Sequence, residues 1–92
     1  MNAIKQSFAL GQLLITPAAR DALTPEEVST SLRRHSQGDW GDVCPYDWQA
    51  NDEALGEGAR LLSVFHSAGN VKFWIISEAD RAATTVLMPD DY

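Results

Sequence analysis

The sequence predicts an α+β domain in which short helices pack on one face of a three-stranded antiparallel β-meander. Two observations lead to this fold class. Apolar residues recur at helical spacing in the first two-thirds of the chain and alternate from residue 59 onward. A length of 92 residues with 45% hydrophobic residues suits one core. We therefore expect a single domain over residues 1–92, with helices first and a small sheet last.

The N-terminal part predicts a short extra strand and then a short helix. Residues 8–15, FALGQLLI, form an apolar run rich enough for a strand, in which Gly11 is typical of a bulge. Thr16 and Pro17 then supply a helix cap and a proline suited to a first helical turn.

A second helix is expected over residues 25–36, and its start is the clearest local signal in the chain. Thr24 and Glu27 have the spacing of a capping box, and Gly38 is suited to end the helix. Three residues fall on its inward face: Val28, Leu32 and His35.

Trp40 lies in the segment GDWGD, between two glycines and two acids. We expect its indole to fill the gap between helix and sheet, and Asp39, Asp42 or Cys44 to cap the next helix. That helix is expected over residues 45–55, and the glycine-containing residues 56–58 should end it.

Three strands are predicted over residues 59–67, 71–77 and 82–88, which are rich in β-branched and aromatic residues. Residues 67–70, SAGN, are typical of a hairpin turn because Gly and Asn tolerate positive φ. Residues 78–81, EADR, are short and polar enough for a second hairpin, whose charges suggest a weak internal ion pair.

The charge balance favours a protein partner over direct binding of nucleic acid. Thirteen acids against seven Lys and Arg give a net charge of −6, the opposite of a basic footprint. Residues 35–59 carry six carboxylates and no Lys or Arg. This stretch is either a solvated helix face or a patch presented to a basic partner, such as a nucleic-acid-binding host protein.

The sequence predicts a cytoplasmic protein without a cofactor or a metal. Cys44 is the only cysteine, and the two histidines are far apart in the sequence. No phosphate-binding loop or dinucleotide fingerprint is present. The chain shows no signal peptide and no apolar run near the roughly 20 residues that a membrane helix needs.

The predicted partner-binding site lies in and just after the GDWGD corner. An exposed aromatic side chain among acids is typical of a protein-binding hot spot. The residues assigned to this site are Asp39, Trp40, Asp42 and Asp47.

An enzymatic alternative is a small ribonuclease of the toxin kind. In it, His35 is the base, Arg60 or Arg81 holds the phosphate and Thr84 gives polar support. The competing interpretation of His35 is a packed side chain that bonds a backbone carbonyl or Asp39. Net acidity counts against RNA as a substrate.

Four segments of the chain carry a family resemblance: GQLLITPAARDAL, RRHSQGDWGDV, NDEALGEGARLLS and KFWIISEADRAATTVLMPDDY. Over nearly the whole chain they resemble the small uncharacterised bacterial "plasmid-related" proteins, which are encoded on plasmids and genomic islands. The resemblance implies an accessory protein of a mobile element and brings no established activity. We expect it to bind a partner, for example as an antagonist of a CRISPR or restriction system.

Overall fold

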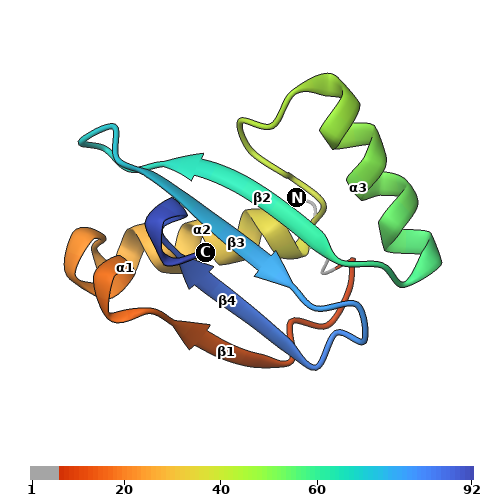
Figure 1. The fold of residues 1–92 in the computed structure, drawn as a ribbon, viewed down its shortest axis with the longest axis horizontal. Helices are drawn as coiled ribbons and strands as arrows, with labels where there is room; N and C mark the ends of the chain where they lie inside the picture. Colours follow the sequence, from red (N-terminus) through yellow and green to blue (C-terminus); the bar gives the residue numbers. More distant parts are fainter. Residues whose placement is uncertain (1–6) are drawn as a thin grey trace, which may run out of the picture.

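The computed structural model of the chain describes residues 7–92, and its elements run in the order strand, three helices, three strands (Figure 1). This arrangement confirms the α+β class. The elements are β1 Gln12–Ile15, α1 Pro17–Ala22, α2 Pro25–Ser36, α3 Pro45–Glu57, β2 Leu61–His66, β3 Lys72–Ser77, β4 Ala83–Leu87 and a final 3₁₀ turn, η1 Pro89–Asp91.

The sheet has four strands in the order β1-β4-β3-β2 (Figure 1). Strands β2, β3 and β4 form the antiparallel meander, as predicted. The extra N-terminal strand that the sequence suggests is β1, but it makes the sheet four-stranded and mixed, because β1 pairs with β4 in parallel, with Gln12 opposite Ala83 and Ile15 opposite Val86. The N-terminal strand thereby supplies hydrogen-bonding partners along the outer side of β4.

Strand β1 is shorter than the predicted run of residues 8–15, and Gly11 explains where it begins. Gly11 has a φ of +68°, which lies outside the extended region, so β1 begins only after it, at Gln12. A Cβ atom at this position would overlap the carbonyl oxygens of Arg81 and Ala82. Gly11 thus lets the chain pass close to the β3–β4 turn instead of forming a bulge.

Helices α1 and α2 begin as the sequence predicts, and α2 has the predicted bounds. The hydroxyl of Thr16 accepts a hydrogen bond from the N–H of Ala19 at 3.2 Å. The hydroxyl of Thr24 accepts from the N–H of Glu27 at 3.1 Å, and the Glu27 carboxylate accepts from the N–H of Thr24 at 2.9 Å. These bonds satisfy N–H groups that have no partner inside a helix.

Helix α3 begins at Pro45, as predicted, and ends two residues later than predicted, at Glu57. Its N-cap is Cys44, one of the predicted candidates, although its side chain makes no cap bond; the alternatives Asp39 and Asp42 do not cap the helix. Both carboxylates are held by other groups, described below. At the other end, Gly56 lies inside the helix and Gly58 forms the C-cap with positive φ.

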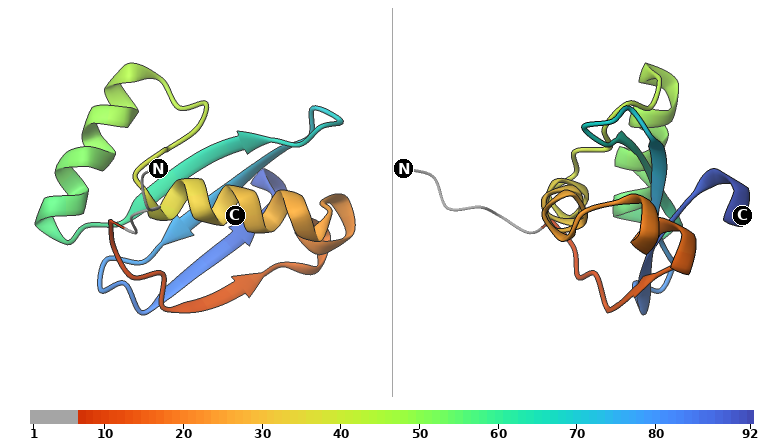
Figure 2. Two further views of the ribbon diagram at one scale, coloured as in Figure 1. Left: turned by 180° about the vertical axis from the view of Figure 1, so that it is seen from behind. Right: turned by 90° about the vertical axis from the view of Figure 1, so that its left-hand side faces the viewer.

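The helices α1 and α2 cover one face of the sheet, and η1 lies on the other (Figure 2). Buried apolar residues on the helix-covered side join α1 to the three meander strands: Ala19, Leu23, Phe65, Phe73, Ile75 and Val86. Trp40 is fully buried in a second cluster with Ala54 and Leu61, which confirms that its indole packs between helix and sheet.

The outer edge of β2 is covered by side-chain and backbone groups. The Asn51 side chain accepts from the N–H of Leu62 at 3.2 Å and donates to its carbonyl at 2.8 Å. Val64 donates to the carbonyl of Trp40 at 3.1 Å and accepts from the N–H of Asp42 at 2.7 Å. This end of the sheet therefore offers few free backbone groups for pairing with another strand.

Candidate functional site: a buried polar chain and an open groove

His35 is the centre of a buried chain of hydrogen bonds that joins α2 to the sheet. Its Nδ1 lies 2.6 Å from the Oγ of Ser63, and its Nε2 lies 2.9 Å from the Oγ of Ser77. The Ser77 hydroxyl lies 2.6 Å from that of Thr84, which donates to the carbonyl of Leu10 at 2.7 Å. The imidazole and all three hydroxyl side chains have no exposed surface.

The donor and acceptor of each hydrogen bond in this buried series follow from its last bond, between Thr84 and the carbonyl of Leu10. Because Thr84 donates its one hydroxyl proton to a carbonyl, it must accept from Ser77, which in turn must accept from His35. Nε2 of His35 therefore carries the proton, and the bare Nδ1 accepts from Ser63. The neutral imidazole satisfies every group in the chain.

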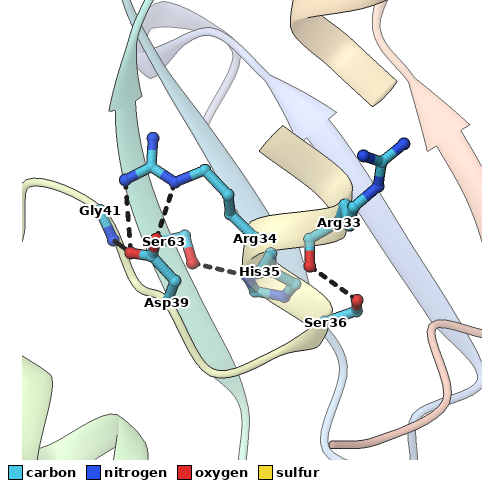
Figure 3. A network of polar contacts seen from close by, with 7 residues as sticks. All are labelled: Arg33, Arg34, His35, Ser36, Asp39, Gly41 and Ser63. Carbon is cyan, nitrogen blue, oxygen red and sulfur yellow. Dashed lines mark hydrogen bonds and ion pairs between the residues drawn. The ribbon is translucent and has the colours of Figure 1, made fainter. Parts of the chain in front are cut away.

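The pKa of His35 is lowered from 6.5 to about 4, first by burial and second by the positive charge of Arg81. The pairing of His35 with Ser63 (Figure 3) has the composition of a base and a nucleophile. Neither side chain is exposed, however. The prediction that His35 bonds a backbone carbonyl or Asp39 is wrong, since its partners are hydroxyl groups.

The two arginines of the enzymatic alternative lie in different places. Arg81 donates to the carbonyls of Ala59 at 2.6 Å and Ala54 at 3.2 Å, and so ties the β3–β4 turn to the end of α3. Its remaining bonds go to carbonyls of its own turn, where no ion pair forms. Arg60 bonds the hydroxyl of Tyr92 and lies 5.1 Å from the centre of its ring. The structure brings Thr84 and Arg81 near His35 but leaves Arg60 apart.

The acids of the GDWGD corner are engaged in local bonds. Asp39 accepts from Arg34 at 2.7 Å and from the N–H of Gly41 at 3.0 Å (Figure 3). Burial acts to raise the pKa of Asp39, but these bonds outweigh it and the pKa lies below its ordinary value. Asp42 lies 2.7 Å from Nδ1 of His66.

Trp40 and Asp47 differ sharply in exposure. Trp40 is fully buried, and its indole N–H donates to Asp52 at 2.9 Å, so it presents no surface to a partner. Asp47 is exposed in the first turn of α3. The exposed aromatic residue beside it is Tyr46, at 81% of full exposure, which the sequence prediction did not include.

An open groove of about 440 Å³ lies between β1 and the α1–α2 pair. Leu13 and Ile15 form its β1 side, and they are 54% and 39% exposed. The opposite wall contains apolar residues of the α1–α2 pair, among them Leu23, Val28 and Leu32. These aliphatic side chains, exposed on β1 and buried or half-buried on the helices, surround a space large enough for side chains of a bound segment.

The outer edge of β1 is free for pairing. The N–H groups of Gln12 and Thr16 donate toward β4 at 2.9 and 3.0 Å. Because successive residues of a strand point their backbone groups to opposite sides, the N–H and C=O groups of Leu13 and Ile15 point outward. Among the described residues no strand lies beyond β1 (Figure 1). The two edges of the sheet therefore differ: β2 is covered and β1 is open.

The distribution of charge along the sequence is itself a signal for this open edge. Residues 6–19 contain no charged side chain, although 22% of the chain is charged. Edge strands are commonly protected by charges or prolines, and Gln12–Ile15 has neither. An unprotected apolar edge strand is typical of a surface that pairs with another chain.

Within residues 7–92, no helix has the length and apolarity needed to cross a bilayer, and no cluster of His, Cys, Asp or Glu side chains is suited to a metal ion. Comparison with protein-family models, with curated proteins and with solved structures finds no match to this chain.

Proposed function

We propose that the protein is a binding module that takes up an extended segment of a partner protein along β1. The observation that carries this proposal is the contrast between the covered edge of β2 and the open, apolar edge of β1. In strand addition, backbone hydrogen bonds supply affinity and pockets for alternate side chains supply specificity. β1 offers both kinds of contact.

The geometry of an added strand follows from the register of β1. Its backbone would bond the outward groups of Leu13 and Ile15. Every second side chain of the segment would then lie on the same face as Leu13 and Ile15, beside the groove. The intervening side chains would lie with Leu14 on the opposite face.

The proposal is tested by selecting displayed random peptides on the immobilised protein and measuring the affinity of the selected sequences. Leu13→Lys is expected to weaken their binding about tenfold or more, because an ammonium group would enter the apolar groove. The same change should alter the free energy of unfolding by less than about 0.5 kcal/mol, since Leu13 is exposed.

Val71→Lys is the matched control, because Val71 is also an exposed aliphatic residue but lies at the β2–β3 hairpin. It should leave peptide affinity unchanged. Selected peptides that bind Leu13→Lys and wild type equally would refute strand addition at β1.

The positions of the polar residues favour binding over the ribonuclease alternative. His35 and Thr84 are fully buried, and Arg81 is occupied by backbone carbonyls. A phosphodiester would need an open site that joins a base to a phosphate clamp. Arg60, the exposed arginine of the set, is bonded to Tyr92 instead.

A second candidate function is recognition of a basic surface by α3, favoured by the exposure of Tyr46. The helix has no basic residue, and four of its acids are exposed: Asp47, Asp52, Glu53 and Glu57. In a mobile-element accessory protein, this face would compete with DNA for a nucleic-acid-binding host protein, such as a CRISPR or restriction enzyme.

This second function predicts inhibition of DNA binding by a restriction endonuclease, measured by a gel-shift assay. The double variant Asp47→Lys, Glu53→Lys should abolish the inhibition, since it reverses two exposed charges on one helix. Asp90→Lys, an exposed acid in η1, serves as the control and should inhibit like wild type. Equal inhibition by all three proteins would contradict a role for α3.

A further inference from the structure

We infer that the segment bound along β1 carries an acidic side chain at each end of its apolar core. This inference rests on the proposed function and names the class of partner. It is drawn from two arginines that flank the groove and from their lack of counter-ions.

Arg20 and Arg33 lie toward opposite ends of the groove. Arg20 lines it from α1, just beyond the end of β1 at Ile15. Helix α2 runs back along β1, so its last turn lies toward the Leu13 end (Figure 2). Arg33 stands in that turn, four residues after Ser29 of the groove wall and on the same side of the helix.

Neither arginine is neutralised by the described part of the chain. Arg33 projects from α2 away from the Arg34–Asp39 pair (Figure 3), and both Arg20 and Arg33 are exposed. Within residues 7–92, ion pairs involve only Arg34 with Asp39 and His66 with Asp42.

The contrast with the other described arginines supports a role for these two. Arg34 bonds a carboxylate, Arg60 bonds a tyrosine hydroxyl and Arg81 bonds carbonyls. The chain has thirteen acids for seven Lys and Arg, so counter-ions are plentiful elsewhere on the surface. Free guanidinium groups at both ends of an apolar groove are complementary to carboxylates of a ligand.

A second copy of the chain fits this site less well. Antiparallel pairing of two β1 strands about Leu14 would place Leu13 of one copy opposite Ile15 of the other. The same symmetry would bring Arg20 of one copy toward Arg33 of the other at both ends. β1 has no charged residue that could compensate this repulsion. An acid-flanked segment of a different protein removes the repulsion and gains two ion pairs.

The test uses three synthetic peptides with the common core LTVTL, flanked on both sides by Asp, Asn or Lys. Fluorescence anisotropy measures their affinity for the wild-type protein. The Asp-flanked peptide should bind about five- to tenfold more tightly than the Asn-flanked one, and the Lys-flanked peptide should bind least. The preference should shrink in about 0.5 M salt, because exposed charges are screened.

The double variant Arg20→Glu, Arg33→Glu should reverse the order and favour the Lys-flanked peptide. Lys72→Glu, which changes an exposed cation at the start of β3, is the control and should keep the wild-type order. If the order of peptide affinities is reversed in the double variant but not in Lys72→Glu, the two arginines recognise the flanking charges.

The outcomes separate this inference from the proposed function. Equal affinity for all three peptides, still lost in Leu13→Lys, would overturn the charge preference and leave strand addition intact. If neither these peptides nor selected ones need Leu13, both proposals fail. A concentration-dependent dimer that Leu13→Lys abolishes in sedimentation experiments would show that a second copy occupies β1, which also overturns the inference.

Discussion

Gly41→Ala is expected to lower the free energy of unfolding by about 2–4 kcal/mol. Gly41 has a φ of +75°, and its backbone pairs with Val64 at the outer edge of β2. A Cβ atom there would overlap the carbonyl oxygen of Val64 and lie 2.8 Å from ring carbons of Phe65. The substitution would therefore push the Trp40 corner away from the sheet.

Urea denaturation measures this effect, and Gly56→Ala provides the control. Gly56 lies inside α3, where an added Cβ atom would meet no other atom within 4 Å. Because alanine favours helices, the control should gain up to about 1 kcal/mol. A Gly41→Ala protein within about 0.5 kcal/mol of wild type would contradict the tight approach of this corner to β2.

The free energy of unfolding is expected to fall by about 2 kcal/mol between pH 7 and pH 5 because of His35. The imidazole has a pKa of about 4 when folded and about 6.5 when unfolded. Between these values the unfolded chain binds one proton more, so stability rises with pH. The contribution of neutral His35 to the free energy of unfolding is complete above about pH 6.5 and is lost progressively as the pH falls toward 4.

Denaturation curves at several pH values test this assignment. Glu27, Asp39 and Asp91 also have lowered pKa values, but their stabilisation is lost only as the pH falls below the ordinary values of 4.5 for Glu27 and 3.8 for the two aspartates. His35→Gln should remove the slope between pH 7 and pH 5, although it is destabilising itself. His66→Gln, at the exposed histidine, should retain the slope. A slope that survives in His35→Gln would contradict a neutral, buried His35.

Local chemistry predicted the helices and the meander well. The bounds of α2 follow from the Thr24–Glu27 capping box and the periodicity behind it, which depend only on neighbouring residues. The Ser67–Asn70 turn follows from the tolerance of Asn70 for positive φ. The parallel pairing of β1 with β4 could not be predicted in this way, because it joins segments about 70 residues apart.

The candidate site was harder to predict because its parts come from separate elements. Charge along the sequence indicated an acidic surface, but it could not show that Asp39 is neutralised by Arg34. The partners of His35 lie 28 and 42 residues away, on two different strands. The groove likewise exists only when β1 reaches the edge of β4 beside α2.

Amide hydrogen exchange, measured residue by residue with and without a selected peptide, tests strand addition at β1 most directly. In the free protein, the amides of Leu13 and Ile15 should exchange fast and that of Leu14 slowly, since of these three amides that of Leu14 faces β4. Bound peptide should slow exchange at Leu13 and Ile15. Saturating peptide that leaves both amides fast and protects another surface would contradict binding along β1.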